Sequence, residues 1–167
     1  MKICDTVNSK LYKNDRAILH SDCNCFYASV ECLLNPNIRD LPVAVSGDAE
    51  NRHGIILAKN EEAKKYNIKT GEAIWQAKKK CPQLLTVPAR LDVYKKFSDK
   101  VRRIYSDYTD MVEPFGLDEA WLDISEDYKN DALTIAEEIS QRIKDEIGIT
   151  VSIGVSFNKI FAKFGSD

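Results

Sequence analysis

Residues 111–125 read MVEPFGLDEAWLDIS, and this stretch decides how the rest of the chain is arranged. Its two ends are apolar, and its centre holds turn-forming residues. The pattern predicts a β-hairpin. The two strands of an isolated hairpin need further partners to form a stable sheet. The elements before and after the hairpin therefore decide the fold.

A helix is predicted on each side of the hairpin. Residues 91–109 place apolar side chains on a single helical stripe, namely Val93, Phe97, Val101, Ile104, Tyr105 and Tyr108. Residues 131–148 form a second amphipathic helix that Gly148 ends, with a buried face made of Ala132, Ala136, Ile139, Ile143 and Ile147. A strand, ITVSIGVS, follows this second helix, and a last helix is predicted to begin in residues 158–167.

The amino-terminal part adds one strand and a mixed insertion. A short buried strand is predicted at residues 17–19, and residues 27–34 have helical spacing. Strands are predicted in LPVAVSG, GIILA and LLTVPAR, with two short helices between the last two. Without this insertion the order is β-α-β-β-α-β, the split βαβ pattern of ferredoxin-like sheets. We therefore predict an α+β fold with a discontinuous sheet domain (1–25 and 92–167) and an inserted domain (26–91).

The composition describes an ordinary globular protein. Of 167 residues, 44% are hydrophobic and 30% charged, and the net charge is −2. The charge does not indicate a nucleic-acid partner, although a local basic patch can bind DNA in a neutral chain. We expect a cytoplasmic protein without a membrane partner, because the first sixteen residues hold no apolar run and no segment is long enough to span a bilayer.

Five cysteines lack the paired C-x-x-C spacing of zinc sites. They are Cys4, Cys23, Cys25, Cys32 and Cys81. The close pair Cys23 and Cys25 could form a metal-thiolate or redox site, but we expect reduced and mostly buried thiols.

Three carboxylates are expected to meet at one edge of the sheet. Asp22 is predicted to lie just past the end of the first strand, and Asp118 and Glu119 at the turn of the hairpin. Strands one and three are neighbours in a split βαβ sheet, so these acids can converge. Their repulsion calls for divalent cations, and oxygen ligands without histidine favour Mg²⁺ or Mn²⁺. The alternative is that each acid is an exposed turn residue. We interpret Asp123, further along the hairpin, as structural.

Four stretches resemble, in order, the motifs of Y-family (DinB/UmuC-type) translesion DNA polymerases. They are SDCNCFYASVE, ILAKNEEAKKYNIKTG, VEPFGLDEAWLDIS and VSIGVSFNKIFAK, within a similarity that runs from Arg16 to the end of the chain. The resemblance implies a palm for the sheet domain and fingers for the insertion. It implies that Asp22, Asp118, Glu119 and the backbone carbonyl of Cys23 bind two Mg²⁺ ions, with Mn²⁺ as a possible substitute.

The same resemblance implies a nucleotide site. Backbone N–H groups around Cys25 and Phe26 are expected to face the triphosphate of a dNTP, and Tyr27 falls at the steric-gate position that excludes a ribose 2′-hydroxyl. Lys64 and Lys159 are expected to contact phosphate. Glu61 stands where many members carry a tyrosine that grips phosphate, and a carboxylate cannot replace that hydrogen-bond donor. The template base pair is expected to lie against Ile55, Leu57 and Ala58.

The implied function is low-fidelity, template-directed nucleotidyl transfer from a dNTP to a primer 3′-hydroxyl. The partners are primer–template DNA and, through a carboxy-terminal region that follows the palm in this family, a sliding clamp. We expect the chain to be the palm-and-fingers part of a longer polymerase. A nucleotidyl cyclase on a similar sheet and a non-catalytic nucleotide- or DNA-binding module are the alternatives.

Overall fold

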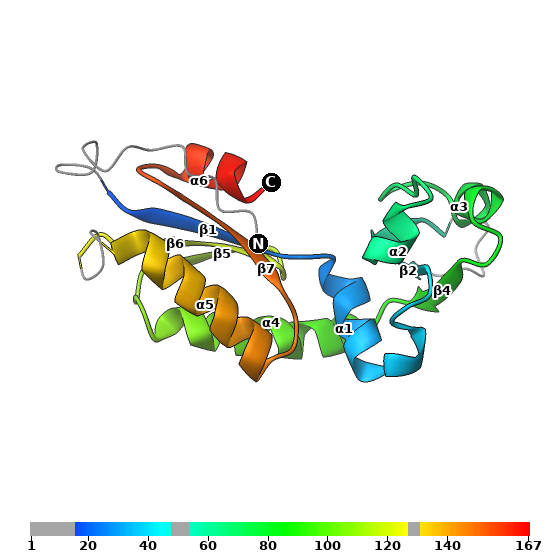
Figure 1. Cartoon of the computed structure of the whole chain (residues 1–167), viewed down its shortest axis with the longest axis horizontal. Coiled ribbons are helices and arrows are strands. Elements are labelled where there is room, and N and C mark those ends of the chain that lie inside the picture. The colour runs from blue at the N-terminus through cyan, green and yellow to red at the C-terminus, as the bar shows by residue number, and fades with distance from the viewer. Residues whose placement is uncertain (1–15, 48–53, 127–130) are drawn as a thin grey trace. The chain divides into compact units, whose positions relative to one another are not determined.

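The computed structural model describes residues 16–47, 54–126 and 131–167 (Figure 1). The chain divides into two compact units. Unit 1 joins Met1–Asn24 to Lys95–Asp167, and unit 2 is the continuous segment Cys25–Tyr94. Each unit contains helices and its own sheet, so the α+β class expected from the sequence is confirmed.

Unit 1 is built on a four-stranded sheet. Its strands are β1 (Ile18–Cys23), β5 (Val112–Phe115), β6 (Glu119–Asp123) and β7 (Val151–Ser156). They lie in the order β5-β6-β1-β7, and each neighbouring pair is antiparallel. β5 and β6 are the two arms of the predicted hairpin. The first strand of the chain therefore runs through the middle of the sheet, between β6 and β7.

The first strand is longer than its apolar residues predict. The sequence indicates a strand over residues 17–19, whereas β1 continues through His20, Ser21 and Asp22 to Cys23. The predicted end was wrong because a central strand has hydrogen-bonding partners on both sides, and these hold the backbone extended whatever side chains it carries. Asp22 consequently lies inside the strand and not beyond its end.

The two faces of this sheet differ in polarity because side chains alternate along each strand. On one face Leu19, Ala120 and Leu122 are buried, and Figure 1 shows α4 (Leu91–Ser106) and α5 (Ala132–Glu146) on that side. The opposite face carries His20 and Trp121, which are register partners. This second face is covered by α6 (Lys159–Ser166). The acids of β1 and β6 share it.

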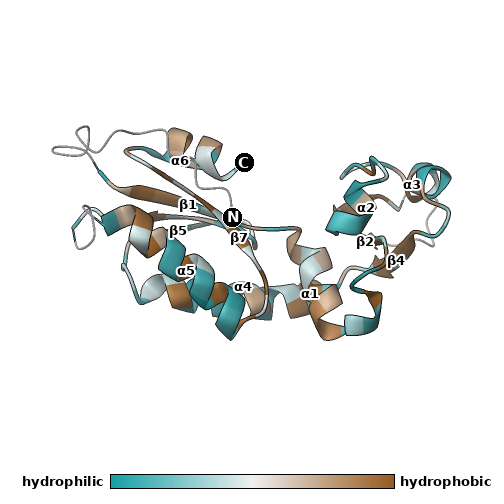
Figure 2. Cartoon of the chain, in the orientation of Figure 1, coloured by the Kyte–Doolittle hydropathy of each residue, from teal (hydrophilic) through white to brown (hydrophobic). Residues whose placement is uncertain are grey.

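The helices of unit 1 bury the stripes that the sequence predicts, with small differences at the ends. On α5 the buried residues are Ala132, Ile135, Ala136, Ile139 and Ile143. Ile147 lies just after the helix and is half-buried, and Gly148 takes the positive φ of 88° that ends it. Figure 2 shows teal, hydrophilic residues along the visible side of α5. Within the described residues no helix is long and apolar enough to cross a membrane.

Unit 2 packs short elements on a three-stranded sheet. The helices are α1 (Phe26–Leu34), η2 (Pro36–Ile38), α2 (Glu61–Lys64) and α3 (Ile74–Lys80), and the strands are β2 (Val43–Ser46), β3 (Ile56–Lys59) and β4 (Leu85–Pro88). The order is β3-β2-β4, with β2 antiparallel to β3 and parallel to β4. Asn60 ties these elements together, because its Oδ1 accepts from the backbone N–H groups of both Val43 and Ala63.

A glycine allows α6 to lie directly on the sheet. Gly154 of β7 is buried, and an added Cβ would stand 1.9 Å from the carbonyl oxygen of Ala162 and 2.6 Å from the backbone nitrogen of Ser166. On the helix side, a Cβ at Gly165 would stand 3.1 Å from the Cα of Gly154. The two backbones therefore meet at a distance that only glycine permits.

Replacing Gly154 with alanine should destabilise the chain by about 3 kcal/mol, because the atoms in conflict belong to the helix backbone and cannot rotate away. Urea unfolding measures the effect. The matched control is Gly47→Ala, because a Cβ at Gly47 meets nothing within 4 Å and should change stability by less than about 0.5 kcal/mol. Equal losses in the two variants would contradict the close packing of α6.

Candidate functional site

Three carboxylates converge at one end of the β1–β6 pair. Asp22 and Glu119 are direct register partners, so their side chains leave the same face of the sheet. Asp118 immediately precedes Glu119, and its carbonyl oxygen accepts a 3.0 Å hydrogen bond from the backbone N–H of Cys23. The turn depends on Gly116, whose φ is +71°. The expected adjacency of the first and third strands is confirmed, and it brings the predicted acids together.

The electrostatics of this cluster show an excess of negative charge. The pKa of Asp22 is raised to about 6, first by burial and then by the charges of Glu119 and Asp118. Burial also raises the pKa of Asp118, and Glu119 adds to that shift. A cation placed among these acids would stabilise the charged forms of Asp22 and Asp118.

Glu119 already has a cationic neighbour. Its Oε2 accepts a hydrogen bond from Nζ of Lys163 on α6, and it lies 3.1 Å from Nε2 of His20. His20 is fully buried, and its Nδ1 lies 2.6 Å from the hydroxyl of Ser166. Desolvation by burial lowers the pKa of His20. The sequence analysis did not identify Lys163, His20 or Ser166 as part of this site. The one available signal was the helical spacing of Lys163 from Lys159, which places the two lysines on one side of a helix.

The donor chemistry fits a hard divalent cation. The three acids offer oxygen ligands, which Mg²⁺ and Mn²⁺ prefer. Burial raises the pKa of the Cys23 thiol far above its ordinary value, so its sulfur stays protonated and is a poor metal ligand. In the described part of the chain no three His, Cys, Asp or Glu side chains are already arranged around one point as a closed metal site. Glu119 is turned toward Lys163 and His20 instead.

The described cysteines are all free thiols, as expected. Cys23, Cys32 and Cys81 are buried, and Cys25 is half-buried. Cys4 lies outside the described residues. Cys32 Sγ accepts from the side-chain amide of Asn60 at 3.9 Å, and Cys25 Sγ donates to Oε1 of Glu61 at 3.3 Å.

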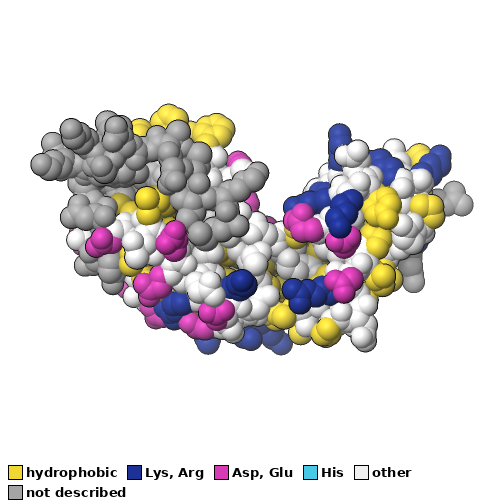
Figure 3. Space-filling model, viewed as in Figure 1, with side chains coloured by type: hydrophobic (Ala, Val, Ile, Leu, Met, Phe, Trp, Pro, Cys, Tyr) yellow, Lys and Arg dark blue, Asp and Glu magenta, His cyan; other side chains and the backbone are white. Residues whose placement is uncertain are grey.

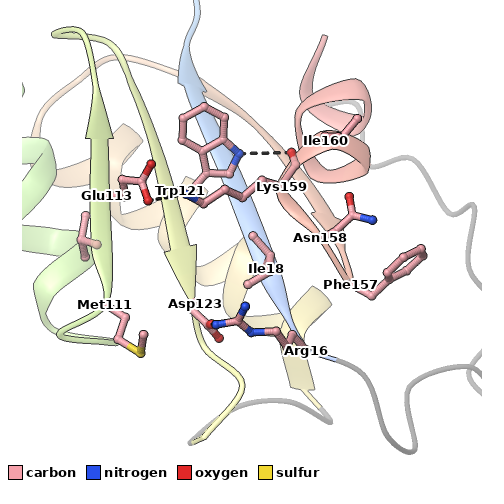
Figure 4. A pocket seen from close by; sticks show the side chains of 11 residues that line it. Arg16, Ile18, Met111, Glu113, Trp121, Asp123, Phe157, Asn158, Lys159 and Ile160 are labelled. Atoms are coloured by element: carbon pink, nitrogen blue, oxygen red, sulfur yellow. Dashed lines mark hydrogen bonds and ion pairs between the residues drawn. The ribbon is translucent and has the colours of Figure 1, made fainter.

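Lys159 contacts a different carboxylate from the three that converge. Its Nζ pairs with Glu113 of β5 and stands 5.4 Å from the centre of the Trp121 ring. Figure 4 shows this pairing beside a groove of about 730 Å³ on the same face of the sheet. Asp123, at the other end of the groove, pairs with Arg16 at 2.9 Å and accepts from the backbone N–H of Ser125. These contacts agree with a structural part for Asp123, whereas the expected phosphate contact of Lys159 stays a prediction.

In unit 2 three of the predicted nucleotide residues, Cys25, Phe26 and Tyr27, lie at the start of α1. Cys25 is the N-cap and adopts a left-handed conformation, with φ 51° and ψ 37°, which is uncommon for a residue with a side chain. Phe26 is buried, and Tyr27 is half-buried. The ring of Tyr27 stacks on Tyr94 with centroids 4.3 Å apart and planes 12° apart.

Tyr94 belongs to a buried polar cluster that the sequence did not indicate. Its hydroxyl donates to Oε1 of Glu31 at 2.7 Å, and Arg90 donates to both carboxylate oxygens of Glu31, at 3.0 and 2.5 Å. Glu31 is buried, and this two-point contact supplies the charge partner that a buried carboxylate needs. The apolar stripe predicted for residues 91–109 begins at Val93, which is half-buried, whereas Tyr94 is fully buried.

Lys64 is paired within its own helix. Glu61 Oε1 accepts from Lys64 Nζ at 2.7 Å. Glu61 and Lys64, the expected phosphate ligand, therefore neutralise each other on an exposed surface. Figure 3 shows many Lys and Arg side chains over α2 and α3 in that view. On β3 and just before it, Ile55 is exposed while Leu57 and Ala58 are half-buried. Their expected contact with a template base stays a prediction.

Comparison with known proteins agrees with this geometry. The model of the impB/mucB/samB family matches residues 21–167. A DNA polymerase IV of Acetivibrio thermocellus is 61% identical over 91% of this chain and 39% of its own length. The crystal structure of DinB from Sulfolobus solfataricus superimposes with a TM-score of 0.83 at 32% identity, over 88% of this chain and 44% of that one. An insertion ternary complex of Dbh DNA polymerase matches with the same score and coverage at 31% identity.

The chain thus spans about two fifths of the length of the relatives that it matches. The match of the family model covers nearly the whole described chain, including all three acids and α6. The chain belongs to the impB/mucB/samB family, and with it to the Y-family of DNA polymerases.

Proposed function

We propose that this chain is the catalytic palm-and-fingers part of a DNA-directed DNA polymerase that transfers a nucleotide from a dNTP to a primer 3′-hydroxyl. The observation that carries the proposal is the convergence of Asp22, Asp118 and Glu119 at one end of the β1–β6 pair, in a chain of this family. Residues 1–25 and 92–167 form the palm, and residues 26–91 form the fingers. The strand order of unit 1 supports a ferredoxin-like split βαβ arrangement for the palm.

The proposed cofactors are two Mg²⁺ ions, with Mn²⁺ as a substitute. Asp22, Asp118, Glu119 and the backbone carbonyl of Cys23 are the proposed ligands. When bound, such a pair of ions stabilises the attacking and leaving oxygens of phosphoryl transfer. The chain's own contribution is preorganisation: strand pairing places Asp22 against Glu119 before any ligand arrives. Burial raises the pKa of Asp22, and the charges of Glu119 and Asp118 add to this shift, which supports the need for cations.

The proposed nucleotide ligands are backbone groups at the start of α1 and two lysines. Backbone N–H groups at Cys25 and Phe26, at the start of α1, suit a triphosphate because the first amides of a helix have no partner within it. Lys64 and Lys159 are proposed as further phosphate ligands. Lys64 has to leave Glu61, and Lys159 has to leave Glu113, before either can reach phosphate. Ile55, Leu57 and Ala58 are proposed to face the template base pair.

Tyr27 is proposed as the steric gate that excludes ribonucleotides. The stack on Tyr94 supports this role, because a ring that must reject a single hydroxyl group has to be held still. Tyr94 is held in turn by its hydrogen bond to Glu31. The Tyr27 ring therefore packs against a tyrosine that is itself held by the buried carboxylate of Glu31.

The proposed partners are primer–template DNA and a dNTP. Similarity to a ternary complex of Dbh DNA polymerase supports this proposal. We further propose low-fidelity translesion synthesis, a cytoplasmic location, and contact with a sliding clamp through a region that follows the palm in family members.

Replacing Asp118 with asparagine should lower the rate of primer extension at least about 10³-fold, because the amide keeps the shape of the side chain but removes a charged ligand. The assay uses this chain fused to the part of the Acetivibrio thermocellus relative beyond the matched region. The control is Asp123→Asn, at the end of the adjoining strand β6, which should keep the rate within about threefold. An active Asp118→Asn fusion would remove Asp118 from the metal site.

Replacing Tyr27 with alanine should raise incorporation of ribonucleotides relative to deoxyribonucleotides by at least about tenfold, since a missing methylene-sized contact already changes selectivity by this factor. The ratio of kcat/KM values for rNTP and dNTP in the same fusion measures it. Tyr66→Ala, at an exposed tyrosine in the same unit, serves as control. Unchanged sugar selectivity in Tyr27→Ala would show that another residue is the gate.

The metal-free chain should lose stability, relative to its Asp22→Asn variant, as the pH rises from about 4 to about 6. In that interval the unfolded chain releases the Asp22 proton while the folded chain, with its raised pKa, still binds it. The free energy of unfolding should therefore fall by on the order of 2 kcal/mol compared with the variant. Urea unfolding in EDTA measures this difference, and Mg²⁺ should reduce it. A difference that does not change with pH would contradict the crowded environment of Asp22.

A further inference from the structure

We propose that Lys163 is the built-in counter-ion of the acidic site: its ammonium group holds Glu119 when no divalent cation is bound and has to release it when one binds. Lys163 is then a positioning residue that sets how tightly the site takes Mg²⁺ or Mn²⁺. This inference rests on the proposed function, because it requires a cation site at Asp22, Asp118 and Glu119.

The contact is direct and extends electrostatically to the whole cluster. Nζ of Lys163 donates to Oε2 of Glu119, with 35% of the lysine side chain and 20% of the glutamate side chain exposed. The charge of Lys163 also lowers the pKa of Asp22 and of Asp118, against the larger effects that raise them. One ammonium group therefore acts on all three acids, which an ordinary surface ion pair does not do.

The position of Lys163 is set by the way α6 is attached to the sheet. Gly154 lets the helix backbone lie against β7, and the hydroxyl of Ser166 lies 2.6 Å from Nδ1 of His20. At the start of the helix, the Trp121 indole donates to the carbonyl oxygen of Lys159 at 3.2 Å. These contacts fix the backbone at both ends of α6. One helical turn separates Lys159, which faces Glu113, from Lys163, which faces the acids.

Among the described residues His20 and Lys163 contact Glu119, and of these two only Lys163 can move away. His20 is fully buried and is fixed by Ser166 on its other nitrogen. Lys163 is partly exposed and carries four rotatable methylene groups, so its head can move into solvent without moving the helix. A cation that needs Glu119 as a ligand therefore has to compete with Lys163 and not with His20.

The sign of the effect follows from charge. A lysine that stays near a bound divalent cation repels that cation. A lysine that pairs with Glu119 occupies a carboxylate that the cation needs as a ligand. Both effects weaken cation binding. Removal of the charge should therefore tighten binding by at least about fivefold, the factor that a single unit-charge interaction at contact distance contributes in water.

The test measures Mn²⁺ binding to the 167-residue chain through the electron paramagnetic resonance signal of free Mn²⁺. Lys163→Met and Lys163→Gln should each lower the dissociation constant at least about fivefold. Lys163→Arg keeps the charge and should stay close to the parent chain. The control is Lys144→Met, at an exposed lysine on α5. Circular dichroism confirms that each variant is folded.

An unchanged or weaker affinity in both neutral variants would overturn the role of Lys163. The Asp118→Asn chain separates this failure from that of the proposed function. Asp118→Asn should abolish Mn²⁺ binding at the proposed site. If neither the parent chain nor Lys163→Met shows Mn²⁺ binding that depends on Asp118, the proposed metal site is wrong, and this inference is wrong with it. If Asp118-dependent binding is present but does not respond to the loss of the Lys163 charge, only the counter-ion role is wrong.

Discussion

The pairing of β1 with β6 is the constraint on which the rest of this structure depends. Each strand alone carries one acid at this position, and neither strand makes a site. The antiparallel register sets Asp22 opposite Glu119, and the turn that enters β6 brings Asp118 beside them. The cost of this arrangement is visible in the raised pKa of Asp22. Backbone hydrogen bonds along the strand pair hold together carboxylates that would otherwise separate.

The asymmetry of the sheet gives this cluster its surroundings. One face is covered by the long helices α4 and α5 and is apolar, with Leu19 and Leu122 buried. The other face is covered by the short helix α6, which approaches closely because Gly154 has no side chain. A short helix leaves part of the face open, and the groove beside Trp121 lies there (Figure 4). The same helix supplies Lys163, whose ammonium group pairs with Glu119.

Much of the fold could be predicted from the sequence, but the details of the site could not. The hairpin at residues 111–125 and the helix that Gly148 ends were predicted from local turn chemistry and helical periodicity, which act between residues close in the chain. The end of β1 was predicted wrongly, because pairing with two distant strands overrode the polar residues His20 and Ser21. Tyr94 was missed for a similar reason: its partner Glu31 is 63 residues away.

The sequence by itself determined the element order, the hairpin and the identity of the acids that could converge, since periodicity, turn residues and motif spacing are local properties. Only the tertiary structure decided which side chains meet. It set Lys163 and not Lys159 against Glu119, and it placed buried His20 behind the same carboxylate. The reason is physical: helix spacing makes both lysines equivalent candidates, and only the close contact of α6 with β7 determines where each ammonium group lies.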